Sequence, residues 1–340
     1  MDMKRRGKYL FWLSVIGAVF GLAGCSTTAE RKETPQYPLE AVEMIAPAGR
    51  GSGYDLTVRS VSQCLLNTKL VPVPLPVTNK PGGGGEITLR YLEENRGKND
   101  VISMFSPPVC LIHLNGDTGL NYVENTTPIA QLIVDYGCIS VRSDSQYHTL
   151  GQIMDVLKND PKALNVGGTS SVGSMDHIQF LKIARAAGVD NLKDIPYEGF
   201  ENGGAVTQLM GKRVDVLSTG ISDVVGLVES GDIRVLAVTS GERLDGDVIS
   251  QMPTCREQGI DAEFVIWRGL FGPGDMPDYA VEYWENVLRK MAETKEWETV
   301  CKRYGWTMEY KNHEEFRSFL DTVNEEYREL LEEVGLLKGQ

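Results

Sequence analysis

The chain has 340 residues, which is enough for two domains with separate hydrophobic cores. It carries 34 Lys and Arg against 47 Asp and Glu, and this net charge of −13 argues against a nucleic-acid-binding protein, because an acidic surface repels phosphates. Hydrophobic residues make up 41% of the sequence and charged residues 24%, which is typical of a globular protein and excludes a wholly disordered chain.

The N-terminus predicts export from the cytoplasm. Residues 2–8 hold four basic side chains, and the almost uncharged apolar run 9–22 is shorter than the ~20 apolar residues that a membrane-spanning helix needs. The small residues Ala23 and Gly24 precede Cys25. This order resembles a bacterial lipoprotein signal over residues 1–24, which implies cleavage before Cys25 and attachment of a diacylglyceryl lipid to its sulfur. The alternative is an uncleaved anchor helix.

Loss of this signal would make the protein more acidic. It removes four basic residues and one acidic residue, which changes the net charge from −13 to −16. Residues 25–38 then form a polar tether. The five cysteines that remain are odd in number and form no CxxC pair, so we predict no structural zinc site. An exported protein can form disulfides, and we assign none from the sequence. The five cysteines are Cys64, Cys110, Cys138, Cys255 and Cys301.

From residue 39 on, short apolar runs alternate with longer amphipathic stretches, which predicts an α/β fold with parallel sheets. Strands are predicted over 41–46, 71–77, 101–105, 129–141, 164–167, 214–217, 235–239 and 264–271. Helices are predicted over 56–66, 150–158, 174–187, 203–210 and 279–290. A last amphipathic helix begins after Asn312, and Glu315 three residues later completes a capping box.

The loop 46–55, between the first strand and the first helix, is a candidate anion site. Its glycines allow backbone N–H groups to approach a ligand closely, and the N-terminus of the following helix favours negative charge. A phosphate site is disfavoured, because no GK[ST] follows and Tyr54 stands where a dinucleotide fingerprint starting at Gly49 requires glycine. A tight turn in which Asp55 caps the helix is an equally good interpretation of the loop alone.

A second strand-to-helix loop, 166–177, combines glycines with four hydroxyl side chains. Its N–H and hydroxyl groups, together with the helix dipole, can hold a carboxylate without an arginine. A nucleophilic serine is the alternative, but neither this loop nor residues 220–224 complete G-x-S-x-G. None of the four histidines forms an HExxH pair, and His177 is better placed as a hydrogen-bond donor than as a catalytic base.

Read in order, these segments resemble the substrate-binding receptors of tripartite tricarboxylate transporters, the TctC or Bug family, from about residue 39 to residue 337. The matching segments are 46–59, 79–85 with its four successive glycines, 127–130, 167–177, 196–199, 211–215, 231–239, 252–259 and 267–274. Two positions depart from the family pattern. Arg50 stands where proline is common, and Ala48 where a bulky aromatic residue often stands; we expect Arg50 to face solvent.

The resemblance implies a two-lobed, periplasmic-binding-protein-like fold of the type II or Venus flytrap class, with a parallel-rich sheet in each lobe. Lobe 1 would comprise residues 39–138 and 267–340, and lobe 2 residues 139–266, joined by crossing strands. The two loops would hold the ligand carboxylate in the cleft, partly through bridging water. The implied ligand-binding residues are Gly51, Ser52, Gly53, Tyr54, Asp55, Ser106, Thr169, Ser170, Ser171, Gly173, Ser174, His177, Gly199, Ser222 and Asp223.

The function implied by the resemblance is capture of a small di- or tricarboxylate, or a related organic acid, for uptake. The partners would be a large and a small membrane subunit, with the receptor lipid-anchored on the extracytoplasmic face of a bacterial membrane. No enzymatic activity, metal, cofactor or nucleic-acid partner is expected. Two alternatives stay open, namely a ligand sensor for a membrane kinase and a secreted hydrolase of carboxylate esters. A charge of −16 repels a polyanion at long range. Hydrogen-bond donors inside a shielded cleft would therefore have to outweigh this repulsion, and screening over ~8 Å weakens the contribution of distant charges there.

Overall fold

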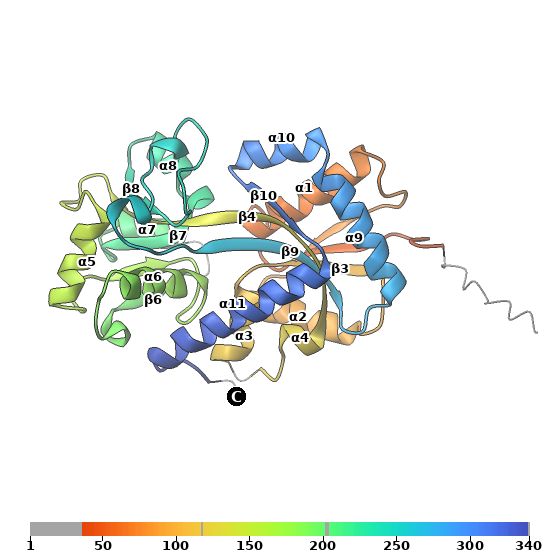
Figure 1. Cartoon of the computed structure of the whole chain (residues 1–340), viewed down its shortest axis with the longest axis horizontal. Coiled ribbons are helices and arrows are strands. Elements are labelled where there is room, and N and C mark those ends of the chain that lie inside the picture. Colours follow the sequence, from red (N-terminus) through yellow and green to blue (C-terminus); the bar gives the residue numbers. More distant parts are fainter. Residues whose placement is uncertain (1–35, 117, 201–203, 339–340) are drawn as a thin grey trace, which may run out of the picture. The chain divides into compact units, whose positions relative to one another are not determined.

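The computed structural model describes residues 36–116, 118–200 and 204–338 (Figure 1). The predicted signal peptide, its Cys25 and residues 25–35 of the predicted tether lie outside the described residues, as does the start of the predicted helix 203–210. No helix in the described ranges is both long enough and apolar enough to cross a membrane.

The first sheet has three parallel strands at one edge. They are β2 (Val77–Asn79), β1 (Glu43–Ala46) and β3 (Val101–Phe105), in that order across the sheet. Strand β9 (Val265–Pro273) pairs antiparallel with β3 on one side and with the long strand β4 (Thr126–Arg142) on the other. Strand β10 (Thr307–Lys311) also pairs antiparallel with β4.

The second sheet repeats this arrangement. Its parallel strands are β6 (Tyr197–Gly199), β5 (Val166–Gly168) and β7 (Val216–Gly220). Strand β4 pairs antiparallel with β7 and with β8 (Ile233–Val238). Since Tyr136 is the last β4 residue paired with β9 and Gly137 the first paired with β7, β4 passes from one sheet to the other at this point. The structure thus has the predicted two-lobed α/β fold, while the exact lobe boundaries stay a prediction.

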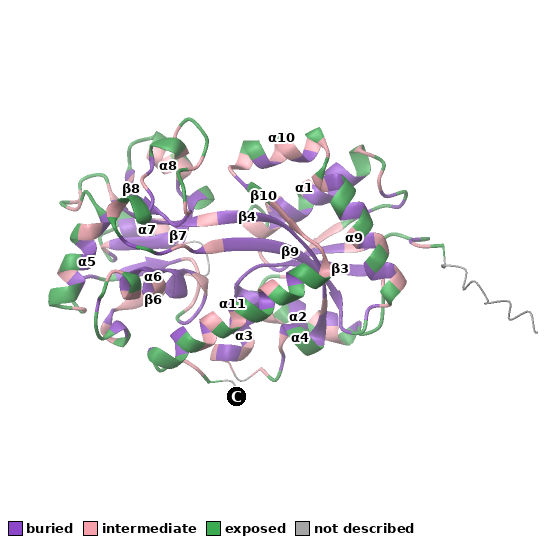
Figure 2. Ribbon diagram, viewed as in Figure 1, coloured by how far each residue is buried: buried purple, intermediate pink, exposed green. Residues whose placement is uncertain are grey.

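Helices pack against both sheets. They are α1 (Gly53–Asn67), α2 (Glu86–Glu94), α3 (Pro108–Asn115), α4 (Tyr122–Asn125), α5 (Leu150–Asn159), α6 (Met175–Ala186), α7 (Ala205–Met210), α8 (Val225–Glu229), α9 (Asp278–Ala292), α10 (Lys295–Tyr304) and α11 (His313–Glu333). Figure 2 shows β4 and β9 buried along most of their length and the exposed residues on the outer sides of the helices. Helix α11 packs against both α3 and α6, and its predicted capping box between Asn312 and Glu315 is present.

One predicted strand is largely wrong. Of residues 71–77 only Val77 belongs to a strand, although Val71, Val73 and Leu75 are buried as the alternation predicts. The residues between them are prolines, whose nitrogens carry no hydrogen for a strand ladder. The carbonyl oxygen of Pro74 still accepts from Val42 N, just before β1, and that of Pro76 from Met44 N of β1, so the segment lies along the sheet without completing a ladder.

The cores are built around large aromatic side chains. Trp267 of β9 is fully buried and contacts Phe271 and Phe316 with its ring, which fastens α11 to the crossing strands. Trp284 and Trp297 are buried in the core on the other face of the first sheet. The five described cysteines are all buried with free thiols, as expected of small apolar side chains.

Candidate functional site

The first loop is fixed by the residue that follows it. Asp55 accepts hydrogen bonds from Gly51 N at 2.9 Å, from Arg59 Nε at 2.9 Å and from Asn79 Nδ2 at 2.8 Å. The helix cap is Ser52, whose Oγ accepts from the backbone N of Asp55, so the expectation that Asp55 is the cap is wrong. Burial alone would raise the pKa of Asp55, but these hydrogen bonds hold it below its usual value. Asp55 is therefore ionised, and its carboxylate holds the loop in position.

This arrangement leaves two donors unused at the start of α1. The N–H groups of Gly53 and Tyr54 make no hydrogen bond within the described part of the chain, as is usual for the first turn of a helix. Burial raises the pKa of the Tyr54 hydroxyl to about 12, against the opposing effect of Ser106 beside it. Arg50 is exposed, as expected. The loop can thus offer backbone donors to an anion.

The second loop is folded around a carboxylate of its own. Asp176 Oδ2 accepts from Thr169 N and Thr169 Oγ1, both at 2.7 Å, and from Ser170 N at 3.0 Å. Ser170 Oγ in turn accepts from Asp176 N at 2.9 Å. The N–H and hydroxyl of Thr169 and the N–H of Ser170, which the family resemblance assigns to the ligand, are therefore bonded to Asp176. The side-chain hydroxyls of Ser171 and Ser174 have no partner among the described residues.

His177 lies on the same loop and is 6% exposed. Its Nδ1 accepts a hydrogen bond from Gly173 N at 3.0 Å, and its ring stacks on Tyr197 at 4.3 Å between centroids. Burial lowers the pKa of His177 to about 4, so the ring is neutral near pH 7. Because Nδ1 is an acceptor, the proton is on Nε2, which fits the predicted role of a hydrogen-bond donor.

The second loop faces lobe 1 across a small hollow of about 230 Å³. Ser171 and Ser174 line one side of it, and Gly83 and Gly84 of the 3₁₀ turn η1 (Gly83–Gly85) line another. Residues 82–85 all have positive φ, a path that only successive glycines follow without strain. Asn115 of α3 donates to Gly173 O at 2.6 Å and ties the hollow's rim together. The structure brings the second loop and the four-glycine segment side by side.

The remaining predicted residues lie around these loops. At Gly199 a Cβ atom would lie 2.3 Å from Ser170 O, so β6 packs directly on the second loop. Ser222 and Asp223, in the 3₁₀ turn η3 (Ile221–Asp223), are exposed. Ser222 Oγ donates to Asp135 Oδ2 at 3.0 Å, and Asp223 Oδ2 accepts from Thr219 Oγ1 at 2.7 Å.

Sequence reasoning missed a buried ion pair on the crossing strands. Arg268 of β9 and Asp135 of β4 are 6% and 2% exposed, and Arg268 Nη2 lies 3.0 Å from Asp135 Oδ2. Arg268 Nη1 donates to Thr57 Oγ1 of α1 at 2.9 Å. Burial raises the pKa of Asp135, and the charge of Arg268 opposes this effect. The available signal was one charged residue in each of the predicted strands 129–141 and 264–271.

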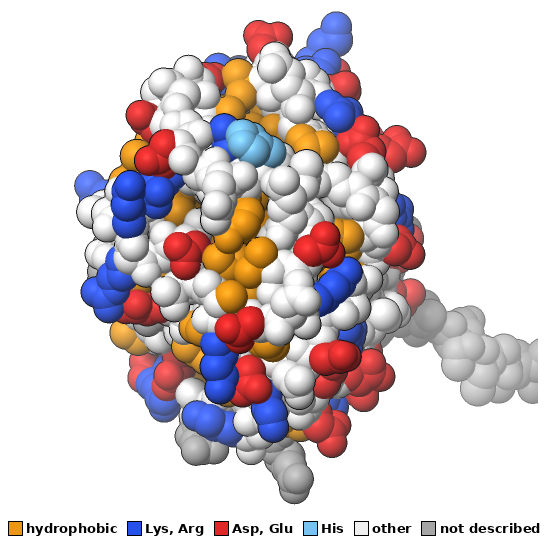
Figure 3. All heavy atoms as spheres, turned by 90° about the vertical axis from the view of Figure 1, so that its left-hand side faces the viewer, with side chains coloured by type: hydrophobic (Ala, Val, Ile, Leu, Met, Phe, Trp, Pro, Cys, Tyr) orange, Lys and Arg blue, Asp and Glu red, His pale blue; other side chains and the backbone are white. Residues whose placement is uncertain are grey.

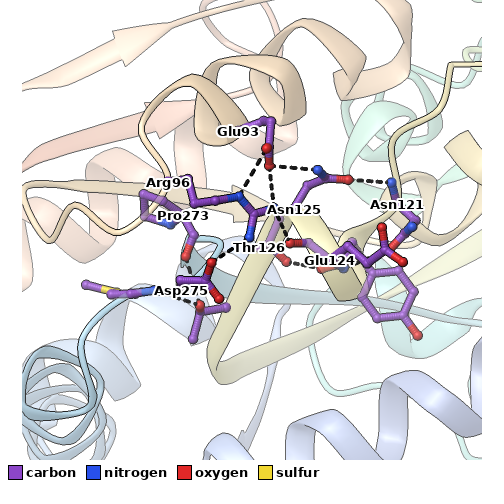
Figure 4. A network of polar contacts seen from close by, with 11 residues as sticks. Glu93, Arg96, Asn121, Glu124, Asn125, Thr126, Pro273 and Asp275 are labelled. Atoms are coloured by element: carbon purple, nitrogen blue, oxygen red, sulfur yellow. Dashed lines mark hydrogen bonds and ion pairs between the residues drawn. The ribbon is translucent and has the colours of Figure 1, made fainter.

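A larger hollow, about 630 Å³, lies elsewhere and contains none of the predicted site residues. It is lined by α4, α9 and the start of α11 and is rich in carboxylates. Figure 4 shows the adjacent network, in which Arg96 bonds to Asp275 Oδ2 and to the backbone oxygen of Glu124. On the face drawn in Figure 3, basic and acidic side chains are interspersed, without a basic patch suited to nucleic acid.

Comparison with known proteins identifies the family of this chain. A family model described as "Tripartite tricarboxylate transporter family receptor" matches residues 59–336. The chain belongs to this family. A relative of this receptor, "UPF0065 protein in gbd 5'region" of Cupriavidus necator, is 24% identical over 332 residues, which cover 95% of each chain.

Two solved structures share the receptor's fold. A Rhodopseudomonas palustris protein solved with adipate has a TM-score of 0.77 at 17% identity and covers 88% of the receptor and 99% of its own chain. MatC of the same species, solved with malate, has a TM-score of 0.71 at 18% identity, covering 89% and 100%. The family consists of solute-binding proteins, and at these identities the structural likeness shows the two-lobed fold.

Asp176 gives the receptor a specific pH dependence. Burial raises its pKa to about 6 despite the hydrogen bonds from Thr169 and Ser170. Because this folded-state pKa lies above the unfolded value, the group stabilises the fold most below about pH 4, and the contribution falls as the pH rises through 6. We expect the unfolding free energy of wild type minus that of Asp176→Asn to fall by about 2 kcal/mol between pH 4 and pH 7.

Urea titrations at several pH values measure this difference. Asp190→Asn, which changes an exposed aspartate on the same lobe, is the matched control and should leave no such trend. A wild-type minus Asp176→Asn difference that stays flat over this range would show that Asp176 is charged throughout.

Proposed function

We propose that the protein is an extracytoplasmic receptor that captures a small carboxylate and delivers it to the large and small membrane subunits of a transporter. The observation that carries the proposal is the hollow lined by Gly83, Gly84, Ser171 and Ser174. The hydroxyls of the two serines have no partner among the described residues. The adipate and malate in two proteins of the same fold support a small dicarboxylate as ligand.

Each loop has a part in this proposal. Ser171, Ser174 and His177 Nε2 donate to the ligand from lobe 2, and the N–H groups of Gly53 and Tyr54 donate from lobe 1. The remaining predicted residues position these donors or line the cleft. They are Gly51, Ser52, Asp55, Ser106, Thr169, Ser170, Gly173, Gly199, Ser222 and Asp223.

A screen of mono-, di- and tricarboxylates by thermal shift tests the proposal. An acid present at 100 times its dissociation constant stabilises the folded receptor by ~2.7 kcal/mol, which raises the melting temperature measurably. We expect at least one small carboxylate to do so while its amide does not. If no carboxylate raises the melting temperature and neutral or cationic solutes do, the proposed function is wrong.

We also propose that the receptor is lipid-anchored through Cys25, which follows the small residues Ala23 and Gly24. Mass spectrometry of protein from the native membrane should find lipidated Cys25 as the first residue. Equal processing and membrane attachment of a Cys25→Ser variant would contradict this anchor.

Ser174→Ala is expected to weaken carboxylate binding by about 1.5 to 3 kcal/mol, because a charge-assisted hydrogen bond is lost. Isothermal titration calorimetry with the best acid of the screen measures the change. Ser318→Ala, which alters an exposed serine of α11, should bind like wild type. If the folded Ser174→Ala variant also keeps wild-type affinity, Ser174 does not contact the carboxylate.

Asp55 tests whether the first loop acts through its position. Asp55→Ala removes the acceptor for Gly51 N, Arg59 and Asn79 and should lower affinity, whereas Asp55→Asn keeps the shape and one acceptor oxygen and should do less harm. Calorimetry and melting curves of both variants measure this. If both variants melt like wild type and Asp55→Asn lowers affinity as much as Asp55→Ala, the negative charge of Asp55 itself matters. Asp55 would then contact a cationic group of the ligand, and the assignment of a simple carboxylate would be wrong.

A further inference from the structure

We propose that Arg268 is a ligand-binding residue that determines specificity, its guanidinium supplying the positive charge that recognises the ligand's carboxylate at the start of α1. This inference rests on the proposed function and names the side chain that would distinguish an acid from a neutral solute. The sequence pattern indicated two loops, and Arg268 lies outside both of them.

The guanidinium of Arg268 lies next to the start of α1. Arg268 extends from β9 beneath the first loop, where a Cβ atom on Gly53 would lie 2.7 Å from Nη2 and 3.3 Å from Cζ. Arg268 Nη1 donates to Thr57 Oγ1, which itself donates to Gly53 O at 2.7 Å. The guanidinium therefore lies against the residue whose N–H, with that of Tyr54, is unused. An oxygen bound at these N–H groups would be close to a full positive charge.

The guanidinium of Arg268 also has N–H donors to spare. A guanidinium has five N–H donors, and within the described residues two of those of Arg268 are used, by Thr57 and by Asp135. The ring of Trp306 lies 5.4 Å from Cζ and shields the group from water on one side. A buried guanidinium with free donors is suited to a carboxylate, because charge-assisted hydrogen bonds strengthen where water is excluded.

Asp135 has hydrogen-bond partners besides Arg268. Its Oδ1 accepts from Tyr136 N at 2.8 Å and its Oδ2 from Ser222 Oγ at 3.0 Å, in addition to the bond from Arg268. Asp135 thus stays hydrogen-bonded when Arg268 shares its donors with a ligand. Two other arginines lie in or near the first loop. Arg50 is exposed, and Arg59 is 43% exposed and bonded to Asp55, so both are less suited to the role. In a protein of net charge −13, such a local cation offsets long-range repulsion of an anion.

The test compares acids with amides of the same shape. Calorimetry with adipate, succinate and malate, each paired with its diamide, gives the acid-to-amide affinity ratio of wild type, Arg268→Gln and Arg268→Lys. We expect Arg268→Gln to bind the acid about 10- to 100-fold more weakly and the amide as wild type does, with Arg268→Lys in between. Arg317→Gln, which changes an exposed arginine of α11, is the control and should keep the wild-type ratio.

Arg268→Gln leaves Asp135 buried without its cation, so the double variant Arg268→Gln/Asp135→Asn, which has no unpaired buried charge, is measured as well. It should fold and lose the preference for the acid. Equal loss of acid and amide affinity in a folded Arg268 variant, or an unchanged ratio, would show that the arginine is only structural and overturn the inference alone. Failure of wild type to bind any carboxylate of the thermal-shift screen would overturn the proposed function and this inference together.

Discussion

Replacing Asp135 with alanine is expected to lower the free energy of unfolding by about 3 to 5 kcal/mol, because it leaves Arg268 buried without its counter-charge. The pair lies on β4 and β9, the two strands that cross between the sheets, and both side chains are more than nine-tenths buried. Urea-induced unfolding followed by circular dichroism measures the loss.

Asp261→Ala removes an exposed ion-pair partner of Arg256 and is the matched control, expected to cost less than about 1 kcal/mol. If Asp135→Ala is no more destabilising than Asp261→Ala, the buried pair is replaced by water at no cost, and the crossing strands are held together by their apolar side chains alone.

Gly199→Ala is expected to weaken carboxylate binding about tenfold or more, the equivalent of at least ~1.4 kcal/mol. The added Cβ would lie 2.3 Å from Ser170 O and 2.8 Å from Ser171 Cα, and these are backbone atoms that cannot rotate away. The second loop must therefore shift, and the hydroxyls of Ser171 and Ser174 move with it. Calorimetry measures the affinity, and melting curves show whether the variant is folded.

Gly226→Ala provides the control for this prediction. A Cβ at Gly226 meets no atom within 4 Å, and the residue lies in α8 of the same lobe, where alanine is favoured over glycine. Wild-type affinity in Gly199→Ala would mean that the position of the second loop is not what sets binding.

Local sequence patterns predicted most elements of the fold. The alternation of strands and helices gave the α/β class, and Asn312 with Glu315 located the start of α11. The segment 71–77 shows the limit of such patterns, since its burial alternates as in a strand while its prolines prevent the ladder. Helix α3 was missed for the opposite reason, because nearly all of its residues are buried and no polar face marks the helical period.

For the candidate site, the sequence predicted two loops but not the hydrogen bonds within them. Glycines between a strand and a helix marked the first loop, and glycines together with four hydroxyl side chains marked the second. The sequence could not show that Asp176 folds back onto Thr169 and Ser170, since the choice between an internal and an external carboxylate depends on loop geometry. The pairing of Arg268 with Asp135 depends on the register of β4 against β9, which no local pattern determines.

The central claim is that a carboxylate binds between the two loops, and a crystal structure of the receptor with the best acid from the screen tests it most directly. The account predicts a carboxylate oxygen within hydrogen-bond distance of Ser174 Oγ and of the N–H groups of Gly53 or Tyr54, on opposite sides of one ligand. A ligand bound instead in the acidic hollow beside α9 and α11, or held in the cleft by a cationic group against Asp176 or Asp223, would contradict it.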